Sequence, residues 1–320
     1  MFGLTFLSAT SKTTTHRVVP FRITRLLEAV AGYVAGGSGS SALISGIDKV
    51  AFPADTITTL SATLTTARSY AGGFANSGTA GYAAGGFDSS YISGIDKVSF
   101  PADTKTTLSA TLTTARFTNG VFANIGVAGY AAGGEGSGGN ISGIDKISFP
   151  ADSKSTLSAT LTTARAYAAG FANSGVAGYV AGGNDGSYIS GIIKLAFSAD
   201  TLTTLSATLT TARGFGAGFA NSGTAGYVAG GAPSFLSGID KVSFPADTKT
   251  TLSATLTTAR NQPAGFANSG VAGYVAGGID SGNISGIDKI TFPADTKTTL
   301  SATLTTARYG VAGFSNEGTL

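Results

Sequence analysis

A repeat of about 48 residues constrains the fold of this chain more than any other feature. The tripeptide Thr-Ala-Arg ends at six arginines spaced 47 to 49 residues apart: Arg68, Arg116, Arg165, Arg213, Arg260 and Arg308. A Gly-Tyr-x-Ala-Gly-Gly string recurs at the same period and places its tyrosine at Tyr33, Tyr82, Tyr130, Tyr179, Tyr227 and Tyr274. A fixed period of this length is typical of repeat architectures such as propellers. We therefore divide the chain into an N-terminal segment, residues 1–30, and a repeat domain, residues 31–320.

Each copy of the repeat contains four short extended segments separated by turn residues. In the copy that ends at Arg116 they span residues 74–75, 80–84, 95–100 and 107–112. Their β-branched and alternating residues favour strands, and no apolar stripe at helical spacing persists. Four strands per copy with frequent turn signals predict propeller blades. The expected fold is all-β, a six-bladed propeller of four-stranded antiparallel blades.

One copy reads Gly81-Tyr82-Ala-Ala-Gly85-Gly86, then Ile95-Asp-Lys-Val-Ser-Phe100-Pro101, and closes with Ala115-Arg116. This pattern resembles the kelch repeat, which implies a propeller fold and interaction with other proteins. The family's usual fourth-strand tryptophan is replaced by leucine in every copy: Leu60, Leu108, Leu157, Leu205, Leu252 and Leu300. The Gly- and Thr-rich repeats also resemble those of structural and fibre proteins of marine and cyanobacterial phages.

The two ends of the repeat domain complement each other. The chain enters its first copy at the second strand, residues 31–37, and residues 311–318 have the sequence of a first strand with no second strand after it. We expect residues 311–318 to pair with the strands of residues 31–68, so that one blade is closed by both ends. Such pairing removes an open sheet edge.

The net charge of +3 belongs to the N-terminal segment. Residues 1–30 contain Lys12, Arg17, Arg22 and Arg25 against Glu28, whereas the repeat domain has 16 basic and 16 acidic residues. A neutral ring offers no concentrated basic field for nucleic acid. We expect the segment to dock on other structural proteins through Arg17, Arg22 and Arg25, or to be a frayed terminus.

The composition argues against an enzyme and against a cofactor or metal. The chain has no Cys and one His, His16, which excludes thiolate chemistry and multi-histidine metal centres. Nearly identical copies also do not bring unlike catalytic residues together. A carbohydrate-active propeller enzyme is the lesser alternative. The sequence shows neither a signal peptide nor a membrane-spanning stretch, so we expect no membrane insertion.

Two segments differ among the copies, one after Gly-Gly and one after Thr-Ala-Arg. In an up-and-down blade both emerge on the same face. All aromatic residues outside the repeated positions and residues 1–30 fall there: Tyr70, Phe87, Tyr91, Phe117, Tyr167, Tyr188, Phe215, Phe235 and Tyr309. Aromatic rings stack on sugars and anchor protein interfaces. This face is the predicted recognition surface, with packing between blades as the alternative role of its aromatics.

The six repeated arginines have two possible roles. They could form a basic ring at the mouth of the central channel, suited to an anionic sugar, or each could bond backbone carbonyls of an adjacent blade. Taken together, the sequence predicts a non-enzymatic structural or attachment protein, such as a phage tail, tail-fibre or capsid-decorating component, that binds a host-surface glycan or a partner protein. We expect it on a virion or extracellular surface. The alternative is a kelch-type interaction module in the cytoplasm.

Overall fold

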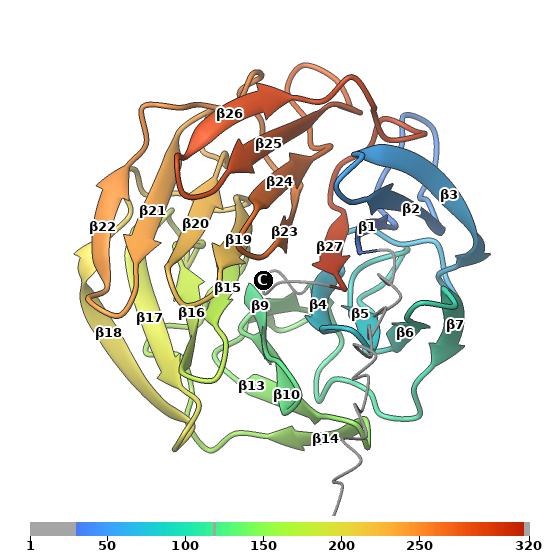
Figure 1. Ribbon diagram of the computed structural model, residues 1–320. Coiled ribbons are helices and arrows are strands. Elements are labelled where there is room, and N and C mark those ends of the chain that lie inside the picture. The colour runs from blue at the N-terminus through green and yellow to red at the C-terminus, as the bar shows by residue number, and fades with distance from the viewer. Residues whose placement is uncertain (1–29, 118–119, 317–320) are drawn as a thin grey trace, which may run out of the picture.

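The computed structural model describes residues 30–117 and 120–316, and within them every regular element is a β-strand. The sheets stand around a common axis in a propeller-like arrangement (Figure 1). The fold is all-β and its sheets are antiparallel, as the sequence predicts. In this part of the chain no helix is long and apolar enough to cross a membrane.

Six sheets have four strands each, ordered from the axis to the rim. The first contains β27 (Ala312–Ser315), β1 (Ala31–Ala35), β2 (Gly46–Ala51) and β3 (Thr56–Thr63). The second contains β4 (Gly72–Asn76), β5 (Ala80–Ala84), β6 (Ile95–Ser99) and β7 (Thr104–Thr107). The third contains β9 (Gly120–Asn124), β10 (Ala128–Ala132), β13 (Ile144–Ser148) and β14 (Ser153–Thr156).

The other three sheets repeat the pattern. The fourth contains β15 (Ala169–Asn173), β16 (Ala177–Ala181), β17 (Gly191–Ala196) and β18 (Thr201–Thr208). The fifth contains β19 (Ala217–Asn221), β20 (Ala225–Ala229), β21 (Ile239–Ser243) and β22 (Thr248–Thr251). The sixth contains β23 (Ala264–Asn268), β24 (Ala272–Ala276), β25 (Ile287–Thr291) and β26 (Thr296–Thr299). Figure 1 shows the first strand of each sheet near the axis and the fourth at the rim.

The described residues form seven sheets rather than the six that the repeat predicts. The seventh is small and contains β12 (Gly139–Asn140), β11 (Glu135–Gly136) and β8 (Arg116–Phe117). It forms because the segment after Gly-Gly in this copy is rich in glycine and turns at Gly139, where φ is 98°. In other copies single bridges, such as Ser69 with Phe87, join the equivalent segments. The seventh sheet therefore extends a contact that is shorter elsewhere.

In four of the six sheets the fourth strand ends earlier than the sequence predicts, whereas in the first and fourth sheets it continues to Thr63 and Thr208. In the second sheet it is β7, Thr104–Thr107, and not residues 107–112. The preceding turn is tight because Asp103 adopts the left-handed conformation, with φ of 53°, so pairing with β6 resumes at Thr104. Beyond β7 the pairing is irregular and continues only through single bonds, such as that from the Leu112 amide to the Ser93 carbonyl.

The hydrophobic core lies between neighbouring sheets. Phe74 of β4 stacks on Tyr82 of β5 with a centroid distance of 5.1 Å, and its ring also packs against Gly129 of the third sheet. A Cβ atom at Gly129 would lie 2.1 Å from the Phe74 ring, so only glycine lets the two sheets approach this closely. Burying such a ring stabilises the fold by about 2 kcal/mol.

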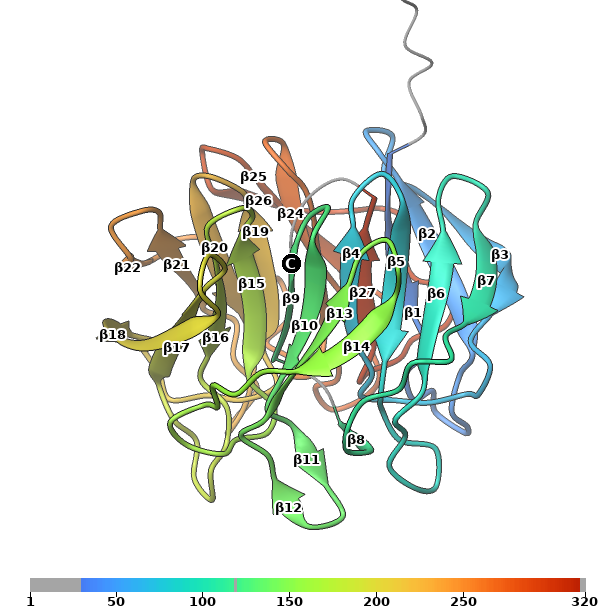
Figure 2. The same ribbon diagram turned by 90° about the horizontal axis from the view of Figure 1, so that it is seen from below.

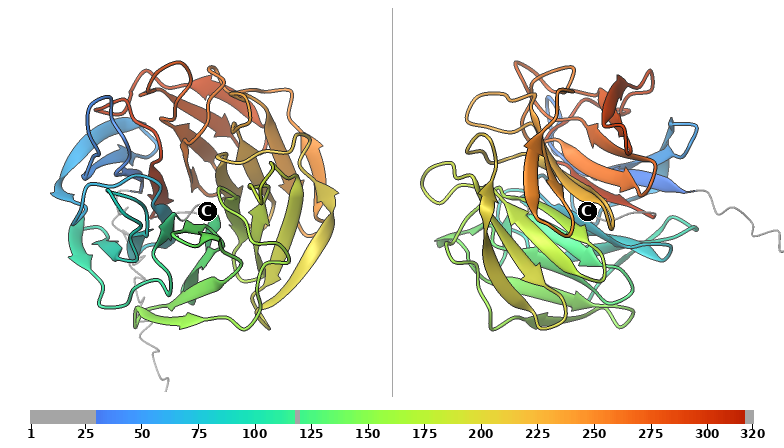
Figure 3. Two further views of the ribbon diagram at one scale, coloured as in Figure 1. Left: turned by 180° about the vertical axis from the view of Figure 1, so that it is seen from behind. Right: turned by 60° about the vertical axis from the view of Figure 1, so that its left-hand side comes forward.

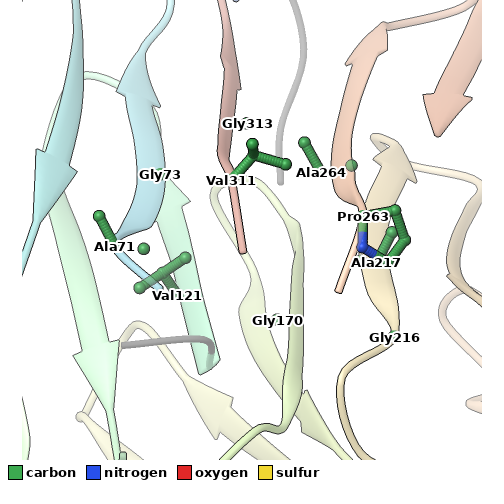
Figure 4. A pocket seen from close by; sticks show the side chains of 13 residues that line it. Ala71, Gly73, Val121, Gly170, Gly216, Ala217, Pro263, Ala264, Val311 and Gly313 are labelled. Carbon is green, nitrogen blue, oxygen red and sulfur yellow. The ribbon is translucent and has the colours of Figure 1, made fainter. Parts of the chain in front are cut away.

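Small residues line the axis. A Cβ atom on Gly218 of β19 would lie 2.0 Å from the carbonyl oxygen of Gly170 on β15, so the first strands pack backbone against backbone. They surround a narrow cavity of about 50 Å³ whose lining includes Val121, Ala217 and Val311 (Figure 4). This lining is glycine, alanine, valine and proline and provides no side-chain hydrogen-bonding group.

The C-terminal strand β27 pairs with β1, with Tyr33 opposite Phe314. The Ala31 amide also donates to Asn316 Oδ1 at 2.7 Å. The predicted pairing segment extends to residue 318, of which residues 317 and 318 lie outside the described residues. The sixth and first sheets meet through Tyr274, whose hydroxyl donates to Asp55 at 2.8 Å, as the hydroxyl of Tyr82 does to Asp152 at 2.7 Å.

The two ends of the sheets define two different faces (Figures 2 and 3). The turn face carries the turns between first and second strands and between third and fourth strands. The loop face carries the segments after Gly-Gly and after Thr-Ala-Arg, including the β11 and β12 hairpin at the bottom of Figure 2. Since β1 runs from Ala31, beside Asn316, toward Gly36, the chain enters the first sheet at the turn face.

Candidate binding surface on the loop face

The second residue after each of five repeated arginines adopts a left-handed backbone. Its φ is 58° at Tyr70, 60° at Tyr167, 59° at Phe215, 58° at Gln262 and 62° at Gly310. This conformation is uncommon for aromatic residues. We call the two residues after each repeated arginine a junction. The left-handed conformation is held by backbone hydrogen bonds that run from one junction to the next around the axis, such as the bond from the Phe215 amide to the Tyr167 carbonyl at 2.8 Å. The same bonds join Gln262 to Phe215, Gly310 to Gln262 and Tyr70 to Gly310.

Three side chains from these left-handed positions and one from the residue directly after Arg116 meet in what we call the aromatic cluster: Tyr70, Tyr167, Phe215 and Phe117. Successive centroid distances are 4.8 Å from Tyr70 to Phe117, 6.1 Å to Tyr167, 3.9 Å to Phe215 and 6.5 Å back to Tyr70. All four residues are only partly buried. They form one continuous aromatic patch on the loop face.

The other predicted aromatics lie around this cluster. Tyr309 is 6.3 Å from Tyr70, while Phe87 and Tyr91 lie 5.5 Å and 4.9 Å from Phe117. Tyr188 lies beside Gly214, where its ring atoms would be 3.2 Å from a Cβ atom. Phe235 is on the loop of the fifth sheet and is 44% exposed. Ring contacts thus join seven of the nine predicted residues.

Sequence comparison among the copies overlooks Glu135, the one glutamate among the described residues. The Tyr91 hydroxyl donates to its Oε1 atom at 3.1 Å, and the Tyr167 hydroxyl donates to its Oε2 atom. Burial, and then these bonds and the carboxylate charge, raise the pKa of both tyrosines above the ordinary value. The available signal was that Glu135 stands where the other copies have Ser38, Phe87, Asn184, Ala232 and Ile279.

Burial also changes the pKa of Tyr70, which lies next to Tyr309 at the edge of the aromatic cluster. Burial and the neighbouring Tyr309 phenol raise the pKa of Tyr70 to about 12. The phenol is therefore neutral at physiological pH. It can act as both a hydrogen-bond donor and an acceptor toward a ligand.

Of the two roles considered for the repeated arginines, the structure disagrees with a basic ring at the channel mouth. The six arginines are buried, with exposures of 1 to 5%, and Arg116 donates to Asp145 of the third sheet at 3.0 Å. Arg116 also donates to the Ala131 carbonyl at 3.0 Å, the kind of contact that the alternative interpretation expected. Such burial lowers the pKa of the arginines, although the nearby aspartates oppose the shift. Their charges lie between sheets and do not face an incoming anion.

One arginine has no such carboxylate. At the position of Asp145 the fourth sheet has Ile193, so Arg165 donates only to the carbonyls of Thr163, Gly182 and Gly191. Burial lowers its pKa as well, with Asp185 opposing the shift.

The N-terminal segment with Arg17, Arg22 and Arg25 lies outside the described residues, apart from Val30. Among residues that the structure describes, no group of three or more His, Asp or Glu side chains could hold a metal ion. No protein-family model matches the chain, and no curated protein is significantly similar to it.

Proposed function

We propose that this protein is a non-enzymatic structural or attachment component of a larger assembly, such as a virion, that binds its partner through the aromatic cluster on the loop face. We also propose that its six four-stranded sheets are the blades of a closed, kelch-like, six-bladed propeller. The pairing of β27 with β1 and the bond from Tyr274 to Asp55 support closure. We interpret the seventh sheet as a loop elaboration, because it extends bridges that the other copies also make.

One observation carries the functional proposal. The left-handed junction position is occupied by Gln262 and Gly310 in two copies, with the same backbone bonds as at Tyr70 and Phe215. The scaffold therefore does not require an aromatic side chain there. Partly exposed aromatic rings that the scaffold does not need are typical of the anchors of a binding surface.

The test replaces three cluster residues by the residue that the scaffold already accepts. We expect the combined variant Tyr70→Gln, Tyr167→Gln and Phe215→Gln to keep its circular dichroism spectrum and to lose attachment to the natural assembly or host surface. Removing aromatic anchors of this kind costs about 2 kcal/mol or more each in binding. Attachment is measured by co-sedimentation of the purified chain with host cells or particles.

The matched control is Gln262→Ala, which changes the same junction position without removing a ring. It should bind as the unchanged protein does. A triple variant that is folded and still attaches would refute the proposal. A triple variant that unfolds, while Gln262→Ala does not, would assign the rings to packing between blades.

A further inference from the structure

We propose that the loop face beside the second, third and fourth sheets binds an uncharged saccharide at a site centred on Glu135. This inference rests on the proposed function, which assigns binding to the loop face, and it names the class of ligand. The site consists of Glu135, Tyr91 and Tyr167 as polar groups, with Phe117 and Phe87 as apolar surface.

The departures from the repeat converge at this place. The seventh sheet occurs only here among the described residues, and it pairs Glu135 with Phe117. Its hairpin projects from the loop face, as Figure 2 shows for β11 and β12. Asn140 at its end donates to the Asn184 carbonyl of the fourth sheet at 2.9 Å. A ligand site needs unlike residues in a fixed arrangement, and these contacts hold one together.

The Glu135 carboxylate is oriented from both sides. Each of its two oxygens accepts a tyrosine hydroxyl, and each keeps a further lone pair for a hydroxyl of a ligand. Carboxylates held by such bonds are strong acceptors. Phe117 pairs with Glu135 in the seventh sheet, and its ring lies 4.9 Å from the Tyr91 ring. One apolar ring face next to a fixed acceptor suits a pyranose, which has a C–H face to stack and hydroxyls to donate.

The shape of the cluster argues against an enclosed cation. Neighbouring rings are already in contact, at 5.5 Å for Phe87 with Phe117 and 5.6 Å for Phe87 with Tyr91. An ammonium cage needs separated rings around a space. The rings here are packed against one another, and they offer a platform instead.

The charge on this face argues against an anionic sugar. The described loop segments carry Asp88, Glu135, Asp185 and Asp280, and none of them carries a lysine. The described lysines all lie on third and fourth strands, and the arginines of this face are buried. Four carboxylates without an exposed cation would repel sulfate, sialate or uronate groups. An uncharged saccharide meets the acceptors without that repulsion.

The experiment uses the full chain. It is titrated by calorimetry with neutral hexaoses of glucose, galactose, mannose and N-acetylglucosamine, and with sialylated and uronate oligosaccharides. We expect binding of at least one neutral hexaose and of none of the anionic probes. Glu135→Gln should weaken that binding about tenfold or more, because a charged acceptor is lost. Asp280→Asn removes the same charge from the loop of the sixth sheet and should leave the affinity unchanged.

Three outcomes would overturn the inference: binding of anionic probes alone, equal weakening by Glu135→Gln and Asp280→Asn, or no binding of any probe. Retained attachment to the natural assembly in the last case would keep the proposed function and point to a protein partner. If the Glu135→Gln variant no longer binds the neutral hexaose and its melting temperature is unchanged, the saccharide site is supported. The triple glutamine variant tests the proposed function separately.

Discussion

At the scale of single residues, the repeated arginines are buried with two different kinds of partner. Arg116 is paired with Asp145, which also accepts the Thr113 amide at 2.9 Å and hydroxyl at 2.6 Å. Arg165, at the same place in the next copy, relies on backbone carbonyls because Ile193 replaces the aspartate. Removing one partner of a buried ion pair strands the other charge away from water.

Because of this difference, we expect the same substitution to lower the free energy of unfolding by different amounts at the two arginines. Arg116→Met should lower the free energy of unfolding by roughly 3 kcal/mol, because Asp145 is left buried without its cation. Arg165→Met should cost clearly less, since no carboxylate is stranded. Urea denaturation of both variants measures the two costs. Equal losses would show that the carboxylate pairing does not determine the stability of this junction.

The repeat itself explains which residues of the candidate site could be located from the sequence and which could not. Comparison among copies located the nine aromatics, because they are the residues that differ where the scaffold is constant. It overlooked Glu135, since one acidic residue in a variable loop gives no signal until folding brings Tyr91 and Tyr167 to its two oxygens. It also left the arginine role open, because the contact with the next sheet's aspartate depends on packing between sheets.

At the scale of elements, second and third strands were predicted closely because their turns are marked by Gly-Gly and Phe-Pro. In the second sheet the fourth strand was placed too far toward Leu112, because its Thr-rich sequence continues after pairing becomes irregular at Leu108. The β11 and β12 hairpin was not predicted, since its Gly-Ser-Gly-Gly segment has no strand pattern. Local propensity therefore indicated strand identity well and strand ends poorly.

The pairing of β27 with β1 leads to a prediction about this sheet. Deleting residues 312–320 removes the partner of β1 and the Phe314 ring that packs against Gly81. We expect the melting temperature to fall by many degrees, or the protein to aggregate through the exposed edge. Deleting only residues 317–320 is the control and should have little effect. An unchanged melting curve for the longer deletion would exclude a stabilising role of β27.

At the scale of the whole molecule, one tyrosine contact links each four-stranded sheet to the next. The hydroxyl of each second-strand tyrosine donates to an aspartate in the turn of the following sheet, as Tyr33 does to Asp103 at 2.7 Å. A lysine completes the contact, here Lys49, whose ammonium lies 5.6 Å from the Tyr33 ring centroid. Burial, and then the aspartate, raise the pKa of these phenols above the ordinary value of about 10.

The raised pKa makes stability fall in alkali. Above pH about 10 the unfolded chain ionises its tyrosines while the folded chain keeps these six protonated, so rising pH favours the unfolded state. We expect the phenolate absorbance of the six residues to appear together with the loss of the circular dichroism signal. Gradual ionisation near the ordinary pKa in a chain that remains folded would contradict this expectation.

The entry of the chain at the turn face gives the molecule a direction. Ala31 lies beside Asn316 at one end of the first sheet, whereas Tyr70 and Phe215 gather at the opposite end of the sheets. The N-terminal end of the described chain therefore lies on the face opposite the aromatic cluster. A copy tethered at this end would be held on its turn face and would present its loop face to a partner.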